Sequence, residues 1–245
     1  LRGGIMSDIR IPYLLPGDEF FLKYIHAVKV STYEQIQRDC YSSLKVNTVG
    51  GRLRRLEENK FIRITLSRSH RGRNCLVSIS KKGFEKHIQD KSIHRKELLS
   101  DAIGHDLNLV DIRYAFKNFP STTMYYTENE IQTWDYEGRE LNSDAIVISK
   151  LKKREFSIPI EYELHMKEKK RYEPIIKKYY NSKNHPFVFF IAESDSIIEK
   201  VEQTERNLFD WEKPKFFYQT RKNFISEKNY FFTNGKGKVL DLTFI

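Results

Sequence analysis

Residues 142–148 read Asn-Ser-Asp-Ala-Ile-Val-Ile, and residues 158–164 read Ile-Pro-Ile-Glu-Tyr-Glu-Leu. Both runs are apolar and rich in β-branched residues, so they are expected to form neighbouring strands. Because side chains alternate across a strand, Glu161 and Glu163 should project from one face, where Asp144 at the start of the other strand can join them. The sequence therefore predicts three carboxylates that converge at one end of a sheet.

Three converging carboxylates repel one another unless a cation lies between them. Hard oxygen ligands that leave positions open for water suit Mg²⁺ or Mn²⁺, and such an ion activates water and stabilises the charge that develops on a phosphodiester. A Mg²⁺ or Mn²⁺ site at Asp144, Glu161 and Glu163 is one interpretation of this pattern. The other is that Glu161 and Glu163 form the solvated face of an ordinary amphipathic strand.

Working outward from these strands, apolar runs and helical stripes alternate along the second part of the chain, which predicts a mixed α/β core. A helix is expected over residues 101–118, with further helices over 167–180 and 194–208. The expected strands are 122–126, 145–148, 156–164, 187–192 and 215–218.

The first part of the chain has a different order. Apolar stripes at helical spacing predict helices over 18–30, 33–41 and 45–60, with Asp18 as a potential N-cap of the first. Strands over 61–66 and 76–79 come next, joined by a polar loop over 67–74. Three helices followed by a hairpin is the order of a winged helix-turn-helix, whose third helix enters the major groove of DNA.

Charge favours DNA as the partner of this part. Lys and Arg outnumber Asp and Glu by 43 to 33, which gives a net charge of +10, and the pI is about 9.4. Basic residues gather on the predicted third helix and on the loop, where they can neutralise phosphates. A winged helix that binds protein instead, with solvated arginines, is the alternative. The predicted DNA contacts are Asn47, Thr48, Arg52, Arg54, Arg55, Arg68, Arg71 and Arg73.

The domain organisation is inferred from these patterns. Residues 1–5 end before Met6 and resemble the remnant of a cleaved tag, residues 6–90 form the predicted winged helix, and residues 91–245 form the second domain. A charged helical connection is expected over 81–100. Two cysteines and the lack of an apolar run long enough to span a bilayer lead us to expect a cytoplasmic protein without a membrane partner.

Asp144 followed by Glu161-x-Glu163 and a basic helix resembles the PD-(D/E)xK nuclease superfamily, with Ser143 where proline is usual and Glu163 where lysine is usual. A narrower resemblance is to replication-relaxation proteins, which join a winged helix to this nuclease fold and include relaxases of the MobC type. It is carried, in order, by His105-Asp106-Leu107, Glu130 and Trp134, Ser143-Asp144-Ala145, Glu161-Tyr162-Glu163, Lys170-Arg171-Tyr172 and Lys177-Lys178-Tyr179-Tyr180.

The resemblance implies an α+β chain in which a winged helix precedes a PD-(D/E)xK domain with a mixed central sheet. It implies that Asp144, Glu161 and Glu163 bind Mg²⁺ or Mn²⁺ and activate water, and that Lys170 replaces the missing strand lysine. The expected activity is a metal-dependent DNA endonuclease, a MobC-like relaxase that nicks one strand at the transfer origin of a plasmid or integrative element. The expected partners are double-stranded DNA, locally single-stranded at an origin, and accessory transfer proteins.

Two alternatives stay open. One is a site-specific endonuclease of a transposon, replication or defence system. The other is a non-catalytic DNA-binding regulator whose nuclease fold has decayed, which the departures at Ser143 and Glu163 suggest.

Several single residues have two interpretations each. His105 is either a proton shuttle or a structural hydrogen-bonding residue. Lys167, Lys170 and Arg171 form either a phosphate track or a solvated helix face. The nearby tyrosines are read as packing or base-stacking residues rather than nucleophiles, because no His-x-His metal motif accompanies them. These tyrosines are Tyr172, Tyr179 and Tyr180.

Overall fold

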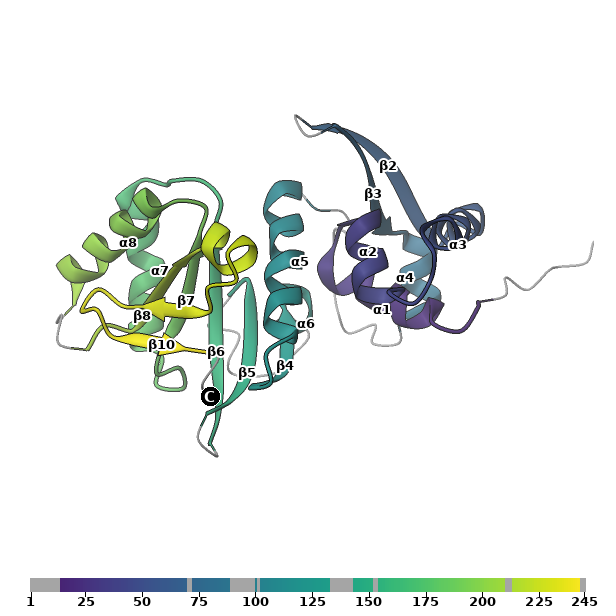
Figure 1. The fold of residues 1–245 in the computed structure, drawn as a ribbon. Helices are drawn as coiled ribbons and strands as arrows, with labels where there is room; N and C mark the ends of the chain where they lie inside the picture. The colour runs from purple at the N-terminus through teal and green to yellow at the C-terminus, as the bar shows by residue number, and fades with distance from the viewer. Residues whose placement is uncertain are drawn as a thin grey trace, which may run out of the picture.

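The protein has an α+β fold with two sheets, as seen in a computed structural model (Figure 1). The structure describes residues 14–69, 72–88, 100, 102–132, 143–151, 154–209 and 213–242, without the side chains of 67–69, 72–74 and 151. Residues 14–88 are named the N-terminal unit, and residues 102–242 the C-terminal unit. The predicted tag remnant at residues 1–5 lies outside the described residues.

The N-terminal unit consists of helices around a three-stranded antiparallel sheet of order β1-β3-β2. Its helices present apolar faces to one core, which includes Phe21, Ile25, Leu53 and Leu56, all at most 1% exposed. Its elements are α1 (Asp18–Val28), β1 (Ser31–Thr32), α2 (Tyr33–Cys40), α3 (Val46–Glu58), β2 (Ile62–Ser69), β3 (Gly72–Ile79) and α4 (Lys81–His87).

Local sequence explains the ends of these helices. The Thr32 hydroxyl accepts from the backbone N–H of Gln35, and the Gln35 side chain accepts from the backbone N–H of Thr32, a capping box that starts α2. The N-cap of α1 is Gly17, at φ 90°, and not Asp18 as predicted. Asp18 is instead the first helical residue and is completely buried.

The C-terminal unit is built on a seven-stranded mixed sheet of order β10-β9-β8-β7-β6-β5-β4. The three strands β6, β7 and β8 run parallel, and the remaining pairs are antiparallel. The elements are α5 (Ile103–Lys117), β4 (Thr122–Thr127), α6 (Glu128–Ile131), β5 (Ala145–Leu151), β6 (Arg154–Glu163), α7 (Lys169–Asn181), β7 (Val188–Ala192), α8 (Asp195–Leu208), β8 (Phe216–Thr220), a short π-helix η2 (Lys222–Ser226), β9 (Phe231–Thr233) and β10 (Val239–Asp241).

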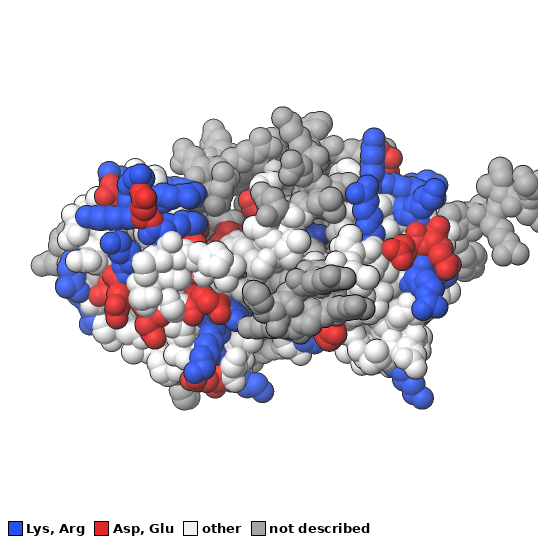
Figure 2. Space-filling view, turned by 90° about the horizontal axis from the view of Figure 1, so that it is seen from above, with Lys and Arg blue, Asp and Glu red and all other residues white. Residues whose placement is uncertain are grey.

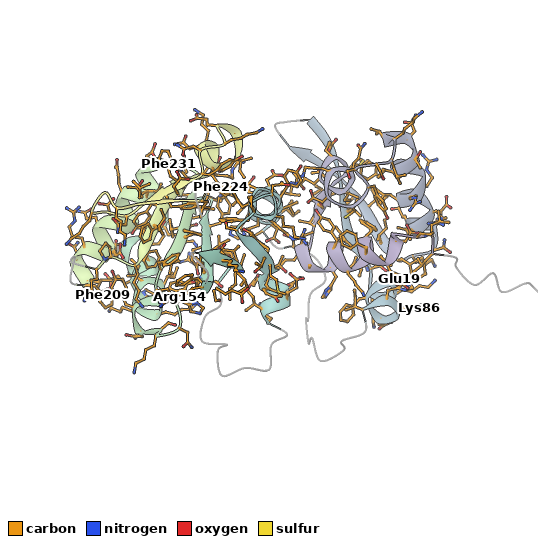
Figure 3. The ribbon with its side chains drawn as sticks, turned by 60° about the horizontal axis from the view of Figure 1, so that its bottom comes forward. Glu19, Lys86, Arg154, Phe209, Phe224 and Phe231 are labelled. Atoms are coloured by element: carbon orange, nitrogen blue, oxygen red, sulfur yellow. The ribbon has the colours of Figure 1, made fainter. Side chains whose placement is uncertain are left out.

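Helices cover both faces of this sheet (Figure 1). On one face α7 and α8 pack through Tyr172, Ile176 and Val201. On the other face α5 packs through Phe116, which lies 4.9 Å from Phe224 of η2 between ring centroids (Figure 3). The carboxyl ends of the three parallel strands are therefore flanked by α5 on one side and α7 on the other.

The predicted helices and strands of the sheet agree with the structure to within a few residues. The hairpin strands are longer than predicted, because β2 and β3 pair without interruption from Ile62↔Ile79 to Ser69↔Gly72. Several short elements were not predicted, because two to five residues carry too little periodicity to be recognised. They are β1, α6, η2 and the pair β9 and β10. Of the predicted connection over 81–100, α4 is present and residues 89–99 lie outside the described part.

Helix α5 of the C-terminal unit lies next to the N-terminal unit in both ribbon views (Figures 1 and 3). Gln35 Nε2 of α2 donates to the carbonyl of Leu107 at 2.9 Å and to Asp111 Oδ1 at 3.0 Å. Arg38 Nη1 donates to the same Asp111 oxygen at 2.7 Å. Asn129 Nδ2 of α6 donates to the carbonyl of His26 at 2.6 Å. Hydrogen bonds therefore join the units at several points along their boundary.

Within the described residues, no helix is long and apolar enough to cross a membrane.

Candidate active site

Asp144 and Glu161 lie side by side at one end of the large sheet. Ala145 of β5 pairs with Ile160 of β6, which places the preceding Asp144 opposite Glu161. The backbone N–H of Tyr162 donates to Asp144 Oδ2 at 2.7 Å. The buried Tyr179 of α7 donates its hydroxyl to Glu161 Oε1. Each carboxylate is therefore held by a hydrogen bond at one oxygen.

The pKa of Glu161 is raised from its ordinary 4.5 to about 8. Burial is the largest cause, and the negative charge of Asp144 is the next. The hydrogen bond from Tyr179 and the charge of Lys178 act in the opposite direction without cancelling the effect. A carboxyl group whose pKa is raised in this way is a candidate for a functional site.

Lys178 of α7 is the basic residue whose charge lowers the pKa of Glu161 most. It is half-buried, and burial lowers the pKa of its ammonium below the ordinary value, although the charges of Glu161 and Asp144 oppose part of this shift. Lys170, which the sequence analysis predicted as the lysine of the active site, lies at a different place on α7. It lies on the first turn of α7, is exposed, and pairs with Glu168 at 2.7 Å. About two helical turns separate Lys170 from Lys178 along α7, so the structure places Lys178, and not Lys170, at the end of the helix near Glu161.

Glu163 does not join the other two carboxylates in the same way. It lies two residues beyond Glu161 on β6, as predicted, and is buried. Its carboxylate pairs with Lys167 Nζ at 2.7 Å, so its charge is already neutralised within the protein. The structure thus brings together two of the three predicted metal ligands and gives the third a partner of its own.

His105, on the first turn of α5, reaches the site from the opposite face of the sheet. Its Nε2 lies 3.1 Å from the carbonyl of Tyr162 and 3.5 Å from Asp144 Oδ2. Its Nδ1 lies 3.5 Å from Asp106 Oδ1. Burial lowers the pKa of His105, but hydrogen bonds and charges from Asp106 and Asp144 outweigh it and raise the pKa to about 10. This shift favours the protonated form of His105, in which both ring nitrogens are donors.

The donor set partly fits the predicted Mg²⁺ or Mn²⁺. Among the residues that the structure describes, no three His, Cys, Asp or Glu side chains form a group able to hold a metal ion. Asp144 and Glu161 nevertheless supply two hard oxygen ligands, each with one oxygen already oriented by the protein. A divalent cation between them would also relieve the repulsion that raises the pKa of Glu161. These two residues would hold the ion, with water completing its coordination.

The raised pKa of Glu161 has a consequence for stability. Between pH 4.5 and about 8 the folded chain binds this proton more strongly than the unfolded chain, so the contribution of Glu161 to stability falls as pH rises through this window. We expect Glu161→Gln to match the wild-type melting temperature near pH 4 and to exceed it increasingly toward pH 8. Mn²⁺ should raise the wild-type melting temperature more than that of the variant. Thermal unfolding over this pH range, with and without Mn²⁺, measures both effects, and a constant difference across the range would contradict the assignment.

The three tyrosines of α7 are packing residues, in agreement with the sequence analysis. Tyr172 and Tyr179 are at most 1% exposed. Tyr180 stacks on Phe209 with ring centroids 3.9 Å apart and donates its hydroxyl to Glu205 at 2.7 Å. Because each ring is packed or hydrogen-bonded within the fold, this arrangement favours a structural role over nucleophilic attack.

On α3, the structure separates the predicted DNA contacts into two groups. Asn47, Thr48 and Arg54 are exposed. Arg52 and Arg55 instead turn toward the buried Asp18: Arg55 Nη2 pairs with Asp18 Oδ2, and Arg52 Nη1 lies 3.5 Å from Asp18 Oδ1. Arg52 Nη1 also donates to the carbonyl of Pro16 at 2.9 Å. The sequence analysis predicted that these two arginines contact DNA and did not predict that they pair with Asp18.

This division gives a matched pair of variants. Arg55→Met leaves Asp18 buried without its strongest partner, and we expect destabilisation toward the lower end of about 3–5 kcal/mol, because Arg52 remains close. Arg54→Met should leave stability unchanged and weaken binding to DNA, with a smaller dependence of affinity on salt. Chemical denaturation and binding titrations at several salt concentrations separate the two results. Equal loss of stability in both variants would contradict the division.

The hairpin arginines are placed only in part. Arg68 and Arg73 face each other in register across β2 and β3, and their side chains lie outside the described residues, as does Arg71. In the C-terminal unit Lys167 is engaged by Glu163, whereas Arg171 is exposed. Seen from above, basic side chains gather over the α3 side and over the α7 and α8 side, with acidic residues among them (Figure 2).

No protein-family model matches this chain, and searches of curated proteins and of solved structures also found no match. The resemblance to replication-relaxation proteins therefore stays a prediction from short motifs. Any function inferred for this chain depends on the arrangement of the residues themselves.

Proposed function

We propose that this chain is a metal-dependent DNA endonuclease. In this proposal the N-terminal unit is a winged helix that selects a DNA site, and the C-terminal unit is a PD-(D/E)xK nuclease domain that hydrolyses a phosphodiester bond at Asp144 and Glu161. More narrowly, we propose a relaxase of the MobC type, which nicks one strand at a transfer origin.

The observation that carries the proposal is the pair of Asp144 and Glu161 with Lys178 beside them. Two adjoining, half-buried carboxylates repel each other, and a hydrolytic metal site explains why they adjoin. The pair lies at the carboxyl end of the parallel strands of the sheet, where open α/β sheets bind ligands. An order of three helices and a hairpin in the N-terminal unit supports the winged-helix assignment.

Each residue at this site has a separate task under the proposal. When bound, the metal activates water and offsets charge on the phosphodiester. Asp144 and Glu161 hold the ion, with Tyr162 and Tyr179 fixing their orientation through hydrogen bonds. Lys178 supplies a positive charge near the reacting phosphate. His105, protonated between two carboxylates, orients Asp144 and limits its movement toward α5.

Helix α3 offers an exposed face that suits close approach to DNA. Gly50 and Gly51 lie within the helix, and a Cβ atom built at either position has no neighbour within 4 Å. Packing inside the protein therefore does not require these glycines, although each weakens a helix by about 1 kcal/mol relative to alanine. A DNA duplex lying against this face of α3 would explain why glycine occupies both positions.

Gly51→Ala tests that role of α3. We expect the variant to be more stable by about 0.5–1 kcal/mol, because alanine lowers the entropy of the unfolded chain and favours the helix. Affinity for DNA should fall, because the added methyl group lies where a phosphate or sugar would approach. Denaturation and binding measurements on the same preparation check both halves. If the variant binds DNA as tightly as the wild type, Gly51 of α3 does not lie in the DNA interface.

Supercoiled plasmid provides the test of the proposed activity. With Mn²⁺, a plasmid carrying the cognate origin should be converted to open circles, and EDTA should prevent the conversion. Linear products from unrelated plasmids would favour the alternative of a site-specific endonuclease of a transposon, replication or defence system. No cleavage of any DNA with Mg²⁺ or Mn²⁺ would overturn the proposed activity.

A non-catalytic DNA-binding regulator is the second candidate, and one observation favours it. Glu163 is neutralised by Lys167 at 2.7 Å, which leaves the site with two carboxylates rather than three to hold a metal. Binding of DNA with no cleavage under any divalent metal would support this alternative.

A further inference from the structure

Lys29 has an unusual backbone at the boundary between the units. It follows α1 with φ 69° and ψ −52°, and the N–H of Val30 donates to the carbonyl of Val28 at 2.8 Å, which closes a γ-turn around it. Residues other than glycine rarely adopt this backbone conformation, which costs roughly 1–3 kcal/mol. Such a conformation persists only where contacts with the surrounding structure hold it in place.

The Lys29 side chain crosses from the N-terminal unit into an acidic part of the C-terminal unit. Its Nζ lies 2.5 Å from Glu128 Oε2 and 3.9 Å from Asp106 Oδ1, and the side chain is only 19% exposed. Beside it is a small pocket with a volume of about 20 Å³, which is also lined by Asp144. Lys29 therefore contributes a positive charge next to the candidate active site from outside the C-terminal unit.

Asp106 is the second carboxylate near the Lys29 ammonium, and the charge of Lys29 helps to lower its pKa, after burial, which raises it, and the hydrogen bond with His105. It is 5% exposed, and its Oδ2 has no hydrogen-bond partner among the described residues. Its Oδ1 faces both Lys29 and His105 Nδ1, the latter at 3.5 Å. His105 in turn reaches Asp144 through Nε2. A continuous row of side-chain contacts thus runs from Lys29 through Asp106 and His105 to Asp144.

We propose that Lys29 is a positioning residue, which fixes Asp106 and thereby holds His105 against Asp144, so that the active site is fully ordered only when the N-terminal unit is docked. The proposal rests on the proposed cleavage at Asp144. The γ-turn aims the Lys29 ammonium at Asp106 and Glu128 together.

The test compares Lys29→Met with Lys29→Arg, and uses Lys23→Met, an exposed lysine on the preceding helix α1, as the matched control. Lys29→Gly is added because it keeps the turn and relieves its strain, so that loss of the charge is separated from loss of folding. Hydrogen exchange of backbone amides 103–108 in metal-free protein reports the order of the first turns of α5. Cleavage with Mn²⁺ gives kcat, and binding without metal gives the Kd for DNA.

We expect Lys29→Met and Lys29→Gly to exchange faster at 103–108 and to lose about tenfold or more in kcat, with Kd for DNA changed less than twofold. Lys29→Arg should recover most of both properties, and Lys23→Met should behave as the wild type. Wild-type exchange and kcat in Lys29→Met would overturn the proposal, as would an arginine variant no better than methionine. If the wild type does not cleave DNA, the proposed function fails, and the exchange of amides 103–108 alone decides whether Lys29 orders α5.

Discussion

Asp144→Asn is expected to lower the rate of DNA cleavage by at least about 10²-fold, because it removes a charged metal ligand from a site that would otherwise hold two. Asparagine can still accept the hydrogen bond from the N–H of Tyr162, so the end of β5 should keep its structure. Glu161→Gln should have a comparable effect. Affinity for DNA in the absence of metal should stay within about threefold of the wild type, because neither residue belongs to the N-terminal unit.

Glu163→Gln is the matched control for this experiment. It removes a carboxylate from the same face of the same strand, but one whose partner is Lys167. Its loss of cleavage should be clearly smaller than that of Glu161→Gln. Plasmid cleavage over a range of Mn²⁺ concentrations measures all three variants. If Glu163→Gln loses as much activity as Glu161→Gln, the active site uses three carboxylates, and the described pairing with Lys167 must open during the reaction.

Lys178→Met should lower kcat by about 10²–10³-fold with little change in DNA affinity, because it removes the positive charge beside Asp144 and Glu161. Lys177→Met is its control, because Lys177 is adjacent in sequence and its side chain is exposed. Lys170→Met should also have a small effect, because Lys170 pairs with Glu168 at the start of the helix.

Single-turnover cleavage with saturating protein separates a loss of chemistry from a loss of binding in these lysine variants. Strong loss in Lys170→Met with normal cleavage in Lys178→Met would restore the interpretation made from the sequence. Weakened DNA binding in all three variants would make α7 a phosphate-binding surface rather than a part of the active site.

The strands and long helices could be predicted from the sequence because their apolar periodicity is strong. The alternation of side chains along a strand also predicted that Glu161 and Glu163 share a face. The predicted start of β5 placed Asp144 at the same end of the sheet. What periodicity cannot give is the partner of a charged side chain. Arg52 and Arg55 look like DNA contacts on α3, yet Asp18, which lies on another helix, engages them both.

The same limit explains the lysine of the candidate site. The sequence places several basic residues along α7, and only packing of that helix on the sheet decides which of them reaches Glu161. Tyr179 is the signal that was available: a large aromatic at a core position marks the part of α7 that faces β6, and Lys178 is its neighbour. Lys29 had no signal of this kind, because its strained turn depends on contacts with Glu128 and Asp106.

The hydrogen bonds of Gln35 and Asn129 across the boundary have a consequence for target choice under the proposed function. They join the N-terminal unit, which would bind the DNA site, to the sheet of the candidate active site. The distance between the bound site and the cleaved bond would therefore be fixed by the protein. The number of nucleotides between the sequence that is read and the bond that is cut would then be set by the protein and not by the sequence in between. Cut positions should keep a constant offset from the recognised bases when the intervening sequence is changed.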